Sequence, residues 1–62
     1  MFTYIITRPT GVVADFGTYH HEQCAIDTAR DAARDGRYKG CLLTIVDHDD
    51  DGSAGIGGAE VL

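Results

Sequence analysis

The sequence has few cysteines and no long apolar run, and each shortage excludes a class of protein. Its only cysteines are Cys24 and Cys41, which are too few for the disulfide framework of a small secreted domain. No stretch approaches the roughly 20 apolar residues that a membrane-spanning helix needs. The segment from Met1 to Thr7 lacks the basic region of a secretory signal. We therefore expect a cytoplasmic protein with free thiols.

Catalytic motifs are also missing. Ser53 is the only serine, and the glycine-rich stretch Gly55–Gly58 is not followed by the Lys-Ser/Thr pair of a phosphate-binding loop. A chain of 62 residues has difficulty enclosing a pocket that excludes water. We expect no enzymatic activity, no catalytic residues and no cofactor.

Basic residues are scarce at one end of the chain. Residues 1–45 contain five acids and five bases, whereas residues 46–62 contain five acids and no Lys or Arg, so the net charge of −5 arises in this last segment. Such a segment repels a phosphate backbone and attracts a basic surface. We predict partner binding, without direct binding of nucleic acid, through its five acids: Asp47, Asp49, Asp50, Asp51 and Glu60.

The composition is that of one folded domain over residues 1–62. The chain has room for a single core, and its hydrophobic content of 44% is too high for a disordered protein. We expect the acidic, glycine-rich segment 47–62 to be partly flexible.

The first half of the chain predicts a hairpin followed by a helix. β-branched and aromatic residues predict a strand over Phe2–Thr7, and Arg8–Gly11 has the residues of a hairpin turn. A second strand is predicted over Val12–Phe16, ending at Gly17. The helix is expected over Tyr19–Asp35.

Three features support this helix. Thr18 is a candidate N-cap, and Gly36 is placed as the C′ residue. Small apolar residues recur at helical spacing between them. These are Ala25, Ile26, Ala29, Ala32 and Ala33.

The second half predicts one strong strand over Cys41–Val46 and a short edge strand over Ala59–Leu62. The order is ββαβ(β), an α+β domain with one sheet of three or four strands and a single helix packed on one face. A right-handed crossover places the third strand beside the first, and we expect the two to be parallel.

Alternation along the strands predicts two apolar faces. The core face is expected to carry Phe2, Tyr4, Ile6, Val12, Ala14, Phe16, Cys41, Leu43 and Ile45. The second face keeps Ile5, Val13, Leu42 and Val46 among Thr3, Thr7, Asp15 and Thr44. One helix cannot cover both faces, so the tail or another molecule, including a second copy, is expected to cover the second.

Two groups of residues have some of the ligands of a metal site. The run Asp47–Gly52 matches the first half of an EF-hand loop, D-x-D-x-D-G, but its twelfth position is Gly58 instead of a bidentate glutamate. Zinc would need His20, Cys24, Cys41 and His48, among which there is no C-x-x-C or H-x-x-x-H pair. We predict no metal ligands and keep a calcium-binding module as an alternative.

In size, charge and layout, the whole chain resembles the small acidic anti-CRISPR proteins of phages and mobile elements, particularly the inhibitors of type I systems. The resemblance implies a stoichiometric inhibitor acting in the host cytoplasm. Its carboxylates would replace phosphates on the basic nucleic-acid-binding surface of a CRISPR effector complex. A structural or antitoxin-like subunit that forms oligomers through the second sheet face is a further alternative.

Overall fold

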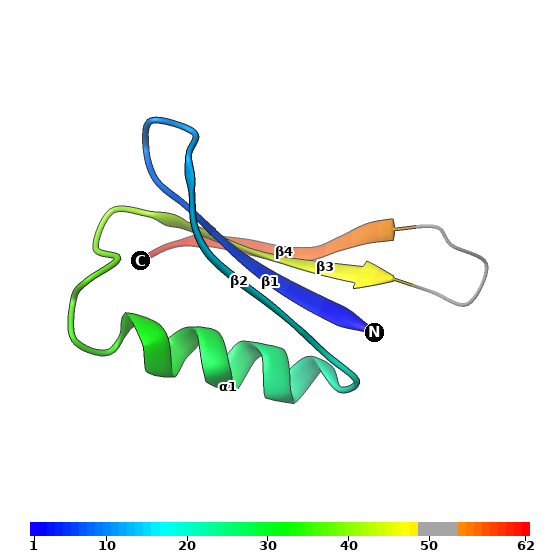
Figure 1. The fold of residues 1–62 in the computed structure, drawn as a ribbon. Helices are drawn as coiled ribbons and strands as arrows, with labels where there is room; N and C mark the ends of the chain where they lie inside the picture. The colour runs from blue at the N-terminus through cyan, green and yellow to red at the C-terminus, as the bar shows by residue number, and fades with distance from the viewer. Residues whose placement is uncertain (49–53) are drawn as a thin grey trace.

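The computed structural model describes residues 1–48 and 54–62, which form an antiparallel four-stranded sheet with one helix on one face (Figure 1). This confirms the predicted α+β fold, including the fourth strand. The elements are β1 (Phe2–Thr7), β2 (Val13–Tyr19), α1 (Glu22–Ala33), β3 (Leu42–His48) and β4 (Ala54–Val61). The strand order across the sheet is β2-β1-β3-β4.

The turn between β1 and β2 forms as predicted. The Arg8 carbonyl accepts a hydrogen bond from the Gly11 amide at 2.8 Å, and the Arg8 amide donates to the Val12 carbonyl at 2.8 Å. Gly11 has a φ of 93°, a left-handed conformation that glycine adopts without steric cost. Pro9 needs no amide hydrogen bond at its position in this turn.

The predicted end of the second strand at Gly17 is wrong, because β2 continues to Tyr19. Gly17 lies opposite Tyr4 in the sheet. A Cβ at Gly17 would lie 2.6 Å from Cε2 of the Tyr4 ring, so the glycine provides the space that the ring fills.

The predicted faces of β2 are also wrong beyond a β-bulge. Ile6 pairs with Asp15 but Thr7 pairs with Val13, so Ala14 is an extra residue on β2. From Asp15 onward the bulge reverses which side chains face the helix. Phe16 therefore lies on the helix-free face and is 68% exposed, while Asp15 lies on the helix side.

Val12, another predicted core residue, lies in the turn and is 60% exposed.

The helix is shorter than predicted at both ends. Its N-cap is His21, which makes no side-chain capping hydrogen bond, so the predicted Thr18 cap is wrong. Thr18 belongs to β2, and its hydroxyl is hydrogen-bonded to that of Thr3 at 3.0 Å. α1 ends at Ala33, and the Gly36 amide donates to the Ala33 carbonyl at 3.1 Å.

The third strand lies beside the first as predicted, but the two are antiparallel, so the predicted direction is wrong. The reason lies in the crossover. α1 carries the chain back along the sheet, so β3 runs in the same direction as β2, and β2 is antiparallel to β1 (Figure 1). The parallel pair of the crossover is β2 and β3, with β1 between them.

The core lies between α1 and the sheet. Alternate residues of β1 and β3 point toward the helix, and the alanines of α1 let it approach closely. The buried residues are Tyr4, Ile6, Ala25, Ala29, Tyr38, Cys41, Leu43 and Ile45. The predicted faces of β1 and β3 are therefore confirmed. In the described part of the chain, no helix has the length and apolar character needed to cross a membrane.

Candidate functional site

The described basic residues gather toward one end of the sheet. Arg8 lies in the β1–β2 turn, Arg30 in the last turn of α1, and Arg34, Arg37 and Lys39 in the segment that leads from α1 to β3. Figure 1 shows the β1–β2 turn and the C-terminal end of α1 at the same end of the molecule. Thr7, next to this turn, pairs with Leu42 at the start of β3.

Part of this positive charge is balanced locally. Arg34 lies 3.3 Å from the Asp31 carboxylate, and Arg37 lies 3.2 Å from Asp35. Both pairs are largely exposed, so each contributes little to stability.

The acidic end of the sheet lies opposite. Asp47 is exposed near the end of β3 and pairs with Phe2, at the other end of β1 from Arg8. Asp49, Asp50 and Asp51 follow in the sequence but lie outside the described residues. Below, "acidic end" means Asp47 together with these three aspartates.

Glu60 does not belong to this group. It lies in β4 opposite Leu43, whereas Asp47 lies opposite Gly55. The four-residue separation from Leu43 to Asp47 along β3 corresponds to about 13 Å. The predicted partner-binding acids are therefore placed in two locations among the described residues.

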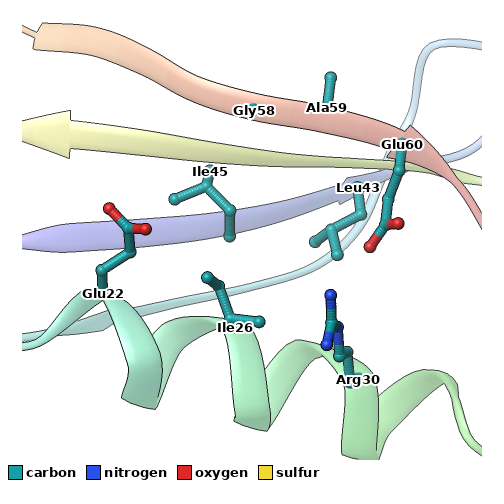
Figure 2. Close-up of a pocket in the computed structure, with 8 residues that line it drawn as sticks. All are labelled: Glu22, Ile26, Arg30, Leu43, Ile45, Gly58, Ala59 and Glu60. Carbon is teal, nitrogen blue, oxygen red and sulfur yellow. The ribbon is translucent and has the colours of Figure 1, made fainter.

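Glu60 instead borders a groove of about 240 Å³ between α1 and the β3–β4 pair (Figure 2). In the described part of the chain, α1 packs on β1, β2 and β3. A Cβ at Gly58 would have no atom within 4 Å, so this position of β4 leaves space. The groove is lined by Glu22, Ile26, Arg30, Leu43, Ile45, Gly58, Ala59 and Glu60.

The groove has an apolar floor and charged sides. Ile26, Leu43 and Ile45 form the floor, and Figure 2 shows the side chains of Arg30 and Glu60 directed toward one another. Its volume of about 240 Å³ is below the range of about 300–1,000 Å³ for small-molecule pockets. Among the described residues, the lining contains no serine, cysteine or histidine. It is suited to holding one apolar side chain between charged groups.

Sequence reasoning missed Glu22 and Arg30 as groove residues, because they belong to a charged helix face. One signal for the groove was present in the sequence. Gly58 and Glu60 are two residues apart, so in a strand they lie on the same side and place a glycine gap beside a carboxylate.

The sheet face without a helix is a second candidate surface, here called the open face. Strand pairing and alternation place on it Thr3, Ile5, Thr7, Val13, Phe16, Thr18, Leu42, Thr44, Val46, His48, Ala59 and Val61. Several of its apolar side chains are well exposed, with Phe16 at 68% and Val61 at 74%. As expected, the one helix leaves this partly apolar face without a helix on it. The described tail residues form β4 at the edge of the sheet instead of folding over this face, so its covering by another molecule stays a prediction.

A tyrosine cluster lies on the helix side. Burial, then the charge of the Asp15 carboxylate, then Tyr19, raise the pKa of Tyr4 to about 12. Tyr38 donates a hydrogen bond to Asp15 at 3.3 Å, and the Tyr4 and Tyr19 rings stack with centroids 6.2 Å apart. Tyr4 is therefore protonated at neutral pH and acts as a packed core residue.

The two candidate metal sites have different outcomes. Cys24 is exposed and Cys41 is buried, and both are free thiols. Within residues 1–48 and 54–62, no three His, Cys, Asp or Glu side chains are grouped so as to hold a metal ion. Most of the Asp47–Gly52 loop lies outside the described residues, so calcium binding there stays a prediction.

Comparison with known proteins found no matching family model, no matching curated protein and no matching solved structure.

Proposed function

We propose that the protein is a non-enzymatic binding protein whose acidic end attaches to a basic surface of a nucleic-acid-binding complex. The observation that supports this proposal is the separation of charge along the sheet. The exposed Asp47, followed in sequence by three aspartates, lies at one end, whereas Arg8 and the bases that follow α1 lie at the other.

With this separation of charge, a basic partner surface would both attract the molecule and orient it. Opposite charges increase the rate of encounter, and like charges disfavour the wrong orientation. A basic partner surface attracts the acidic end and repels the end that carries Arg8 and Lys39. The carboxylates then occupy positions that the phosphates of a nucleic acid would otherwise take.

The partner we propose is the effector complex of a type I CRISPR system, with the protein acting as a stoichiometric inhibitor in the host cytoplasm. This choice follows the chain's resemblance to small acidic anti-CRISPR proteins in size, charge and layout. The inhibitor would compete with target DNA for the basic surface of the complex.

The test is target-DNA binding by a panel of purified type I effector complexes, measured with increasing amounts of the protein. We expect at least one complex to lose DNA binding, with saturation near one inhibitor per blocked site. Adding excess target DNA first should delay the inhibition. If every complex kept full DNA binding in a large excess of the protein, the proposed partner would be wrong.

A further inference from the structure

The two central strands carry apolar residues on both faces. In β3, Leu42, Leu43, Ile45 and Val46 are interrupted only by Thr44. A nearly continuous apolar run is typical of a strand that is buried on both sides. In the structure, α1 covers only the side of Leu43 and Ile45, so within residues 1–48 and 54–62 no layer covers the other side of β3.

The bulge in β2 adds to this uncovered surface. Because Ala14 is the extra residue, Phe16 pairs with Ile5 and faces away from the helix. An aromatic side chain that is 68% exposed beside the half-buried Ile5 is a strong candidate for an interface anchor.

The open face also differs from the rest of the molecule in charge. None of the residues assigned to it above is Asp, Glu, Lys or Arg, although the chain has a net charge of −5. Asp15, Asp47 and Glu60 all lie on the helix side by their strand pairing. The open face is therefore where two copies can meet without placing these strand carboxylates against one another.

We infer that the open face binds a second copy of this chain, giving a symmetric dimer with two sheets packed face to face and the helices outside. A two-fold interface uses the same patch on both copies. A partly apolar patch whose described residues include no Asp, Glu, Lys or Arg is compatible with itself. A basic partner would find no carboxylate among the described residues of this face. The dimer is thus separate from the binding proposed for the acidic end.

The area of the open face indicates how strongly two copies are expected to associate. Four strands spaced by about 4.8 Å and about seven residues rising about 3.4 Å each give a footprint of roughly 450 Å² per copy. Two such footprints total about 900 Å², which is below the roughly 1,200–2,000 Å² of stable specific interfaces and falls among weak, transient ones. We therefore expect reversible association, with a dissociation constant on the order of micromolar.

Sedimentation equilibrium of the full chain tests this inference, over concentrations from about 1 to about 200 µM. The expected result is a monomer–dimer equilibrium that added salt strengthens, because salt screens repulsion between two acidic chains. Phe16→Glu should weaken the dimer at least about tenfold, since it buries a charge on each side of the two-fold axis.

The matched control is Val12→Glu, which adds the same charge at an exposed apolar residue in the turn outside β2. This variant should change the dimer dissociation constant less than about twofold, apart from the added repulsion between two more negatively charged chains. Circular dichroism shows whether each variant is folded, and Val61→Glu replaces Phe16→Glu if the latter does not fold. A wild-type monomer at every concentration, or equal effects of the open-face and control variants, would overturn the inference.

Discussion

At the scale of single residues, Tyr4 connects most of the helix-side features. Its ring fills the space above Gly17, stacks on Tyr19 and lies close to Asp15. The sequence placed Tyr4 on the core face but gave no sign of these partners. They come from the other strand of the hairpin, and the bulge at Ala14 decides which β2 residues face it.

Replacing Gly17 with alanine tests the close packing of this ring. The added methyl group would lie 2.6 Å from a carbon of the buried Tyr4, so the ring must shift. We expect a loss of about 1–3 kcal/mol in the free energy of unfolding, measured by urea denaturation. Gly58→Ala is the control, because nothing lies within 4 Å of the new methyl group. Equal losses in both variants would show that the ring does not restrict position 17.

The raised pKa of Tyr4 predicts a loss of stability in alkali. The ordinary tyrosine pKa is 10.0 and that of Tyr4 in the folded protein is about 12. The unfolded chain therefore loses this proton first, so stability is complete below about pH 10 and falls as the pH rises toward 12.

Tyr4→Phe removes this contribution while keeping the ring. The urea midpoint of the wild type should fall relative to that of Tyr4→Phe as the pH is raised from about 9 to about 11.5. Parallel pH profiles for the two proteins would mean that Tyr4 titrates normally in the fold.

At the scale of elements, the local signals were sufficient for β1 and its turn. β1 has the predicted bounds Phe2–Thr7, and Gly11 has the positive φ expected of the turn. Both depend on residues near one another in the chain. β-branched residues favour a strand, and Arg8–Gly11 has standard turn chemistry.

The errors arose where distant parts of the chain decide the outcome. No glycine or proline marks Ala14 as a bulge, so the face of Phe16 could not be read from local alternation. The direction of β3 depends on the crossover, which connects β2 to β3 and passes over β1, the strand that lies between them. The groove beside Glu60 depends on where α1 lies over the sheet, which alanine spacing alone does not fix.

The register of β3 predicts unequal effects of neighbouring substitutions. Leu43 is 3% exposed and faces α1, whereas Thr44 faces away and is half-buried. Leu43→Ala should cost about 2–5 kcal/mol because it leaves a cavity. A small domain holds little more than about 5 kcal/mol in total, so this variant should be largely unfolded near 37 °C.

Thr44→Ala is the control for the opposite face, and thermal melts followed by circular dichroism compare the two. If Thr44→Ala were the more damaging change, the register of β3 would be shifted by one residue, which exchanges the faces of a strand.

At the scale of the whole molecule, two surfaces have different chemistry. We propose that the acidic end binds a basic surface, and this binding should weaken as salt rises. The open face is partly apolar, and the copies should associate more strongly as salt screens the repulsion between them. The sequence predicted the acidic segment and the second apolar face. It could not predict that Glu60 would be separated from Asp47, because this depends on the register of the β3–β4 pair, which places Glu60 opposite Leu43 and Gly55 opposite Asp47.

The measurement that tests the account most directly is inhibition of effector-complex DNA binding by two matched triple variants across a range of salt. One variant changes Asp49, Asp50 and Asp51 to Asn. The other changes three acids of α1 and the segment that follows it, Asp27, Asp31 and Asp35, to Asn. Each removes three negative charges, from −5 to −2, so total charge is the same.

We predict that the first variant inhibits at least about tenfold less well and loses most of its salt dependence, because the charges that contact the partner are gone. The second should inhibit like the wild type. Equal inhibition by the two variants at every salt concentration would contradict the claim that the acidic end binds the partner.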